Sequence, residues 1–159
     1  MRATRIARYW FGLGLMACAA PPVGAQTASA CAGPKDLCHF FDAFMSALNR
    51  RDWEAFRGTF APDITAIFER PGPPGVQQGR RAVETVFQNI FPRPGTPAAA
   101  LPPALVPEGV VVQTFGDIAI VSFELQRPGQ LARRTLVFHR IGRNWEVVHI
   151  HGSASDLQT

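Results

Sequence analysis

Apolar side chains alternate with polar ones along two runs near the end of the chain, residues 131–140 and 145–153. Both runs are rich in β-branched and aromatic residues, and a short turn containing glycine and asparagine separates them. This arrangement predicts an antiparallel β-hairpin. Because side chains alternate between the two faces of a strand, one face of the last strand is expected to carry four residues together. They are Trp145, Val147, His149 and His151.

Three other segments have strand-like composition, and we predict strands over 64–69, 109–115 and 118–126. Glycine-containing turns separate the last four predicted strands, which are therefore expected to form an antiparallel meander. Residues 92–107 contain six prolines. We predict that this segment is a surface loop or flap within one domain, because neither flanking part could fold alone.

Helical periodicity dominates the first half of the chain. Five apolar residues recur at helical spacing and predict a helix that begins at 34–36 and ends at 49–51. They are Leu37, Phe40, Phe41, Phe44 and Leu48. A second helix is predicted over 53–60, capped by Asp52 and ended at Ala61, and a third over 79–90. Helices segregated from antiparallel strands define an α+β domain.

The first 25 residues have the order of a secretory signal peptide. Arg2, Arg5 and Arg8 precede a short apolar stretch, and small residues lead to a predicted cut after Ala25. We therefore expect a periplasmic or secreted protein with a tail over 26–35 and one domain over 36–159. An alternative is a lipoprotein, because residues 15–18 approximate a lipobox that would leave Cys18 lipidated.

Removing the leader changes the charge of the chain. All 12 acidic residues remain but three arginines are lost, so the net charge falls from +4 to +1. No basic stripe interleaved with aromatic residues remains, and nucleic acid is not an expected partner. A membrane is not expected either, unless Cys18 is lipidated. The two other cysteines, Cys31 and Cys38, are predicted to form a disulfide, and the alternative is two free thiols.

Four phrases carry a resemblance to a known superfamily. They are ALNRRDWEA at 47–55, FAPD at 60–63, GRRAV at 79–83 and WEVVHIHGS at 145–153. Together with the element order, they resemble the nuclear transport factor 2-like fold, and within it the SnoaL-like group. The last phrase is also similar to the end of the association domain of calcium/calmodulin-dependent protein kinase II. The resemblance implies a cone of three N-terminal helices on a strongly bent antiparallel sheet, a homodimer, and an apolar interior.

The chain departs from two patterns of that superfamily. Steroid isomerases of this fold use a carboxylate base, whose position here falls on Phe68 beside Glu69, and a tyrosine, whereas the only tyrosine here is Tyr9 in the leader. The kinase association domain has an arginine directly after the second histidine, where this chain has Gly152. Fold alone does not define function, so these departures leave the reaction open.

Six residues are expected to line a ligand pocket inside the cone: Trp53, Glu69, Arg134, Phe138, His149 and His151. Glu69 and His149 are the candidate catalytic groups, because a carboxylate at a strand end and a histidine near its working pH can transfer protons. Arg134 or Arg140 could clamp a ligand carboxylate with two hydrogen bonds. The alternatives are a solvated charge at Glu69, a rim position for the arginines and a packing role for the histidines.

Metal and cofactor sites are not predicted. His149 and His151 could supply two ligands, but zinc sites need three or four, and the sequence indicates no third ligand nearby. The leading hypothesis is an exported SnoaL-like module that binds a small organic, carboxylated ligand. The alternatives are a SnoaL-like isomerase, cyclase or hydrolase that uses Glu69 or His149, and a dimerisation module without a ligand.

Overall fold

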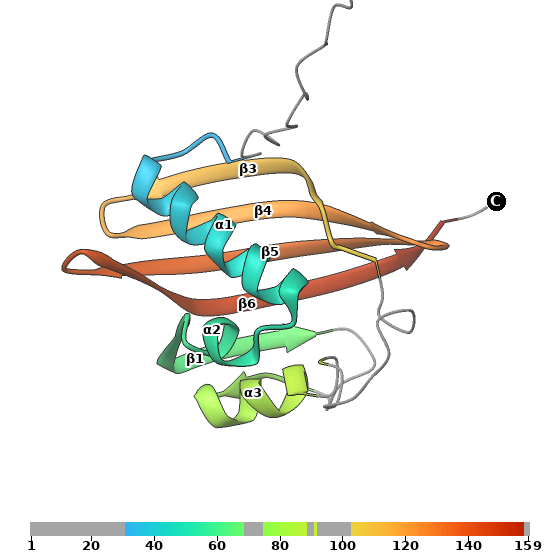
Figure 1. Cartoon of the computed structure of the whole chain (residues 1–159), viewed down its shortest axis with the longest axis horizontal. Helices are drawn as coiled ribbons and strands as arrows, with labels where there is room; N and C mark the ends of the chain where they lie inside the picture. Colours follow the sequence, from blue (N-terminus) through green and yellow to red (C-terminus); the bar gives the residue numbers. More distant parts are fainter. Residues whose placement is uncertain (1–30, 69–74, 89–90, 92–102, 158–159) are drawn as a thin grey trace, which may run out of the picture.

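The computed structural model describes residues 31–68, 75–88, 91 and 103–157, and its helices and strands form one α+β unit (Figure 1). The helices are α1 (Lys35–Arg50), α2 (Trp53–Arg57) and α3 (Arg80–Gln88). The strands are β1 (Phe60–Phe68), β2 (Gln77–Gln78), β3 (Pro107–Phe115), β4 (Ile118–Arg127), β5 (Gln130–Ile141) and β6 (Asn144–Asp156). The predicted signal peptide, including Cys18, and most of the proline-rich segment lie outside the described residues.

The sheet is curved and not closed, with strand order β2-β1-β6-β5-β4-β3. The predicted meander of β3 to β6 is confirmed, because each strand pairs antiparallel with the next. One pairing differs from the expected all-antiparallel sheet: β1 runs parallel to β6, which makes the sheet mixed. A parallel pair needs a long crossover, here the whole chain between β1 and β6. Sequence patterns do not encode which distant strands become neighbours.

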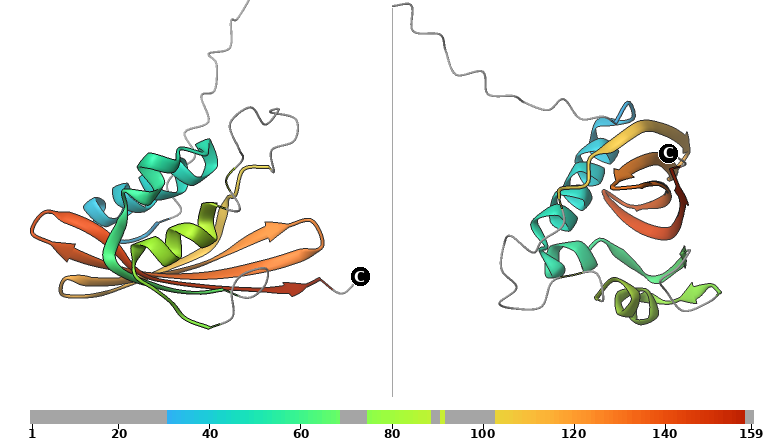
Figure 2. Two further views of the ribbon diagram at one scale, coloured as in Figure 1. Left: turned by 90° about the horizontal axis from the view of Figure 1, so that it is seen from below. Right: turned by 90° about the vertical axis from the view of Figure 1, so that its right-hand side faces the viewer.

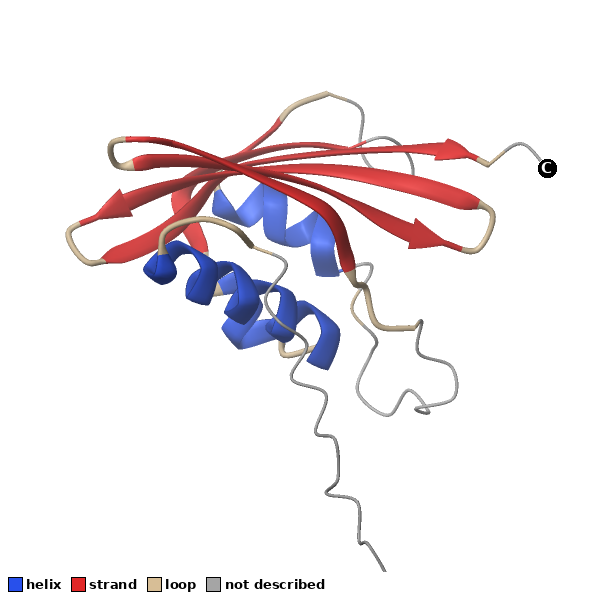
Figure 3. Ribbon diagram, turned by 90° about the horizontal axis from the view of Figure 1, so that it is seen from above, coloured by secondary structure: helices blue, strands red, loops and turns tan. Residues whose placement is uncertain are grey.

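All three helices lie on one face of the sheet (Figures 2 and 3). The core fills the space between the helices and this inner face. Phe56 of α2 is fully buried there and contacts the rings of Phe44, Phe60, Phe87 and Phe91 at centroid distances of 5.0 to 5.2 Å. The opposite face of the sheet, called the outer face below, has no helix over it.

Helix α1 begins and ends within the ranges predicted from the sequence. It begins after Pro34, and Arg51 ends it in the left-handed conformation with φ of 60°. The predicted disulfide is confirmed: Cys31 and Cys38 are bonded, with their Cα atoms 5.5 Å apart. The bond ties the segment before α1 to the first turn of the helix. A Cβ on Gly33 would lie 2.8 Å from a methyl carbon of Val112, so this segment packs closely over β3.

The boundary between α2 and β1 is wrong in the prediction. Helix α2 ends at Arg57, and β1 begins at Phe60 instead of residue 64. The strand begins at Phe60 because this side chain is fully buried and pairs with Val147 of β6. Pro62 is tolerated in the strand because the register with β6 shifts between Phe60 and Thr65, so no regular ladder bond needs its missing N–H.

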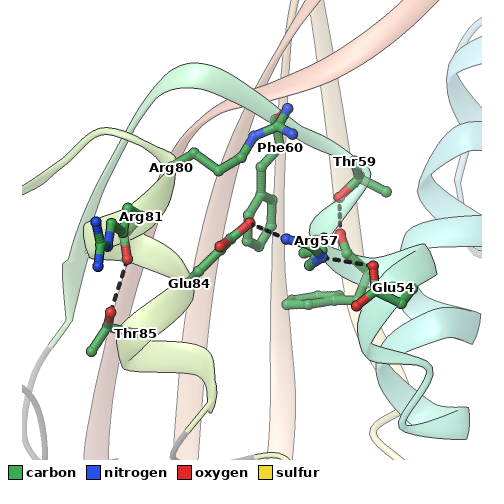
Figure 4. Close-up of polar contacts among 9 residues, drawn as sticks. Glu54, Arg57, Thr59, Phe60, Arg80, Arg81, Glu84 and Thr85 are labelled. Atoms are coloured by element: carbon green, nitrogen blue, oxygen red, sulfur yellow. Dashed lines mark hydrogen bonds and ion pairs between the residues drawn. The ribbon is translucent and has the colours of Figure 1, made fainter.

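Arg57 and Arg80 connect α2, α3 and β1 through polar contacts beside the core (Figure 4). Arg57 forms an ion pair of 2.8 Å with Glu54 of its own helix and a longer one of 3.4 Å with Glu84 of α3. The Arg80 side chain donates a hydrogen bond to the backbone carbonyl of Phe60. These contacts fix the position of α3 against the start of β1, and α3 in turn forms one wall of the cavity described next.

Candidate functional site

A cavity of about 270 Å³ lies between the inner face of the sheet and helices α1 and α3, and we call it the central cavity. Its walls are mainly aromatic and aliphatic. Helix α1 supplies Phe44, Met45 and Leu48, and α3 supplies Val86 and Phe87. The sheet contributes further apolar side chains from β1, β4, β5 and β6: Phe68, Phe123, Leu125, Leu136 and Ile150. Such a concave, mostly apolar space is typical of small-molecule sites.

Polar groups of the central cavity come from the part of the sheet near the turn between β4 and β5. Arg127 ends β4, Gln130 begins β5, and Arg134 lies four residues further along. Gln130 donates a hydrogen bond of 3.1 Å to Asp156, so its amide is already engaged. Arg127 and Arg134 are the charged residues among the described lining residues.

Arg134 is half-buried on the inner face of β5. Its Nη1 donates hydrogen bonds to the backbone carbonyls of Arg133 at 2.7 Å and Ser153 at 3.0 Å. No Asp or Glu among the described residues forms an ion pair with it. Burial, and then the positive charge of Arg127, lower the pKa of Arg134 to about 10. The side chain therefore stays cationic at neutral pH, and no described carboxylate forms an ion pair with it.

Gly152 of β6 is the direct cross-strand neighbour of Arg134. A Cβ at this glycine would lie 3.0 Å from Nη1 and 3.1 Å from Cζ of Arg134, and 3.1 Å from Cδ1 of Phe68. The guanidinium thus packs more closely against Gly152 than a residue with a side chain would normally permit. Sequence patterns predict no role for Gly152 in a pocket, because only the strand register brings it opposite Arg134.

The expected face of the last strand is wrong for the two histidines. In the pairing of β5 with β6, Val137 lies opposite His149 whereas Phe138 lies opposite Val147, so Val148 is an extra residue. This bulge reverses the alternation. Trp145 and Val147 face the core, and Ile150 and Gly152 continue that face. His149 and His151 therefore lie on the outer face, away from the central cavity.

The other predicted pocket residues are placed as follows. Phe138 is fully buried in the core against Phe40, and Trp53 packs on Phe56 and Phe91; neither lines the central cavity. Glu69 lies outside the described residues. Of the five predicted pocket residues that the structure describes, Arg134 is the one that lines this cavity.

His149 makes one specific polar contact on the outer face. Its Nδ1 shares a hydrogen bond of 2.7 Å with the hydroxyl of Thr65 on β1. Partial burial lowers the pKa of His149, and the neighbouring charge of His151 lowers it further. Among the described residues, no three His, Cys, Asp or Glu side chains gather closely enough to hold a metal ion.

Arg140, the other candidate carboxylate clamp, is engaged at the far end of the sheet. Trp145 Nε1 donates a hydrogen bond of 3.0 Å to Asp36 Oδ2, and Arg140 lies 3.6 Å from the same oxygen. The guanidinium of Arg140 also stacks over the Trp145 ring at 5.3 Å. The hydrogen bond from Trp145 is the main reason that the pKa of Asp36 is lowered. These contacts tie the start of α1 to the hairpin of β5 and β6.

The fold and cavity define an α+β domain in which helices and a curved sheet enclose an apolar space. Residues 38–156 match the family model described as SnoaL-like domain, and the chain belongs to this family. No curated protein matches the chain significantly. None of the helices in the described part of the chain is both long and apolar enough to cross a membrane.

Solved structures show the same fold at low sequence identity. A nuclear transport factor 2-like protein of unknown function from Pseudomonas putida KT2440 is 21% identical, with TM-score 0.62 and coverage of 74% of this chain and 83% of that chain. The calcium/calmodulin-dependent kinase II hub of S. rosetta is 24% identical, with TM-score 0.59 and coverage of 79% and 99%. A candidate ketosteroid isomerase from Parabacteroides distasonis ATCC 8503 is 19% identical, with TM-score 0.58 and coverage of 74% and 86%. The expected superfamily and fold class are thereby confirmed.

Proposed function

We propose that the protein is a binding module that takes up a small, largely apolar organic molecule in the central cavity. The observation that carries this proposal is the cavity itself, about 270 Å³ with aromatic and aliphatic walls and a few polar groups at one end. Ligand sites for drug-sized molecules are commonly about 300–1,000 Å³, so this space suits a ligand at or below that size. Polar groups concentrated at one end would orient the ligand.

The charges around the cavity favour binding over proton transfer. Among the described lining residues, the charged side chains are two arginines, which remain protonated at working pH and do not act as general bases. His149, a candidate base, lies on the outer face. Binding of a ligand therefore requires only the apolar walls of the central cavity and its two arginines, and no proton-transfer group.

Filling the cavity tests this proposal. Val86 of α3 lines the cavity, and Val86→Phe should occupy part of the space and weaken binding of apolar probes at least about tenfold, or 1.4 kcal/mol. Displacement of the fluorescent anion 1-anilinonaphthalene-8-sulfonate measures this. The matched control is Val76→Phe before β2, where the side chain is 52% exposed and does not line the cavity. Equal displacement in both variants, or no probe binding by the unchanged protein, would overturn the proposal.

We propose further that two copies pair through the outer face. Val111 and Phe115 of β3 are 57% and 60% exposed, and Ile67 of β1 is 38% exposed. Half-buried Ile118 lies opposite Phe115, and half-buried Ile120 lies opposite Val137, whereas Ile67 is on the far side of β6. A single chain rarely leaves so much apolar sheet in water, and a two-fold partner would cover it.

Export is the remaining part of the proposal. A disulfide between Cys31 and Cys38 is compatible with an oxidising compartment outside the cytosol. We propose cleavage after Ala25, which gives a periplasmic or secreted protein. Intact-mass measurement of the protein recovered from culture fluid and periplasm should show loss of residues 1–25. Retention of Met1 would argue against export, and a lipid on Cys18 would establish the lipoprotein alternative.

A further inference from the structure

We propose that the ligand of the central cavity carries an anionic head group, held by Arg134, and that Gly152 creates the space in which Arg134 can bind it. This inference rests on the proposed binding function and specifies the chemical class of the ligand. The class is a small apolar acid, with one carboxylate at the arginine end and a ring or short chain among the phenylalanines.

The hydrogen bonds of Arg134 leave a free binding edge. Both contacts with described groups come from Nη1, which donates to the carbonyls of Arg133 and Ser153. Nε and Nη2 make no hydrogen bond to a described residue, although the side chain lines the cavity. A guanidinium binds a carboxylate best through two parallel N–H donors, and Nε with Nη2 forms such a pair. The two carbonyls thus hold the Nη1 group of the guanidinium, and the edge formed by Nε and Nη2 is available to a ligand.

Among the described residues, the charge at this end of the cavity is positive and no carboxylate forms an ion pair with Arg134. Arg127, the other charged lining residue in the described chain, is close enough to lower the pKa of Arg134. Two described acids on the neighbouring strands have other partners: Glu124 pairs with Arg133 on the outer face at 3.5 Å, and Asp156 accepts a hydrogen bond from Gln130. A half-buried cation that has backbone carbonyls but no described carboxylate as partners is costly, and an incoming anion would lower that cost.

Gly152 is required for its lack of a side chain and not for its backbone conformation. Its φ is not in the left-handed region, where glycine is favoured. Its Cα instead faces the guanidinium across the strand pair, and a Cβ would come within 3.0 to 3.1 Å of Arg134 and Phe68. Alanine at this position would push Arg134 and Phe68 away by a few tenths of an ångström and so disturb the placement of the guanidinium. Gly152 is therefore a positioning residue, which acts on a ligand only through Arg134.

The test compares an acid with the uncharged molecule of nearly the same shape, 4-phenylbutyrate with 4-phenylbutan-1-ol, by isothermal titration calorimetry. The unchanged protein should bind the acid about tenfold to a hundredfold tighter, as expected for charge-assisted hydrogen bonds. Arg134→Gln should abolish this preference and leave the affinity for the alcohol unchanged. The matched control is Arg133→Gln, one residue away on the outer face, which should retain the full preference.

Gly152→Ala tests positioning separately. It should reduce the preference for the acid as Arg134→Gln does, and the double variant should lose no more than either single variant. Binding of the alcohol reports in each variant that the cavity is intact. Equal affinity for acid and alcohol in the unchanged protein would overturn the inference while the binding function stands. If neither compound binds, the proposed binding function is overturned, and this inference with it. An undiminished preference in Arg134→Gln would overturn the role of Arg134.

Discussion

Asn49 and Leu105 are joined by two hydrogen bonds although 56 residues separate them in the chain. The side-chain amide of Asn49 donates to the carbonyl of Leu105 at 2.9 Å, and the backbone N–H of Leu105 donates to Asn49 Oδ1 at 2.8 Å. The last turn of α1 thus holds the extended segment that leads into β3. Leu105 also lines the central cavity, so this contact fixes part of its wall.

Asn49→Ala should destabilise the protein by about 1–3 kcal/mol, because the peptide groups of Leu105 lose both partners in a half-buried position. Probe binding in the cavity should weaken as well, since Leu105 is no longer held. Urea unfolding measures the first effect, and dye displacement measures the second. Arg50→Ala is the control: Arg50 is exposed, and among the described residues its side chain bonds only to Ser46 within α1. A change in Asn49→Ala no larger than in the control would contradict this role.

Reducing the disulfide should lower the free energy of unfolding by about 2–3 kcal/mol, the value that the chain-entropy model gives for so short a loop. Cys31 and Cys38 are seven residues apart, and their bond holds the segment that packs over Val112. The measurement is the urea midpoint with and without dithiothreitol. The double variant Cys31→Ser/Cys38→Ser should have the same urea midpoint as the reduced protein, and dithiothreitol should not change that midpoint. Two thiols at these positions that react in denaturant without reductant would exclude the bond.

Val111→Glu should convert the proposed dimer to a monomer, because it puts a charge in the middle of an apolar interface. The molar mass measured by multi-angle light scattering at micromolar concentration should fall from twice the chain mass to the chain mass. Val106→Glu is the matched control, since Val106 is 65% exposed but lies before β3. A monomer in the unchanged protein, with a melting temperature that does not depend on concentration, would exclude the dimer.

Protonation of His149 should destabilise the fold. Its pKa is lowered by burial and by His151, whereas the unfolded chain titrates near the ordinary value of about 6.5. Between these two pKa values the unfolded state binds more protons, so stability is full above about pH 6.5 and is lost as pH falls below it. The urea midpoint should therefore drop between pH 7.5 and pH 5.5. His149→Gln should reduce that drop, and His39→Gln on α1 should not; identical pH profiles in all three proteins would contradict the assignment.

The sequence predicts the elements of this fold well because periodicity is a local property. The apolar stripe of α1 and the tight turns of the meander each require only neighbouring residues. The bulge at Val148 is different, because its existence depends on how Phe138 and Val147 pack across two strands. One inserted residue moved His149 and His151 to the opposite face.

The site was less predictable for a related reason. Arg134 could be nominated from its residue type, but its partner Gly152 carries no chemical group that a motif could reveal. Gly152 matters because it has no side chain, which leaves room for Arg134 on the neighbouring strand β5. Likewise, Phe138 lies on the same face of β5 as Arg134, but it is fully buried in the core, where it contacts Phe40, and does not line the cavity.

The parallel pairing of β1 with β6 also sets the order in which the chain can fold. Thr65 and His149 are 84 residues apart, and on its other side β1 has only the two-residue strand β2. Closing so large a loop is slow, whereas β3 to β6 are joined by tight turns and can pair locally. We expect the meander to form first and to serve as the template on which β1 and its helices assemble. Until β6 is complete, β1 exposes an unpaired edge, so truncation near the C-terminus should produce aggregation and not a smaller folded domain.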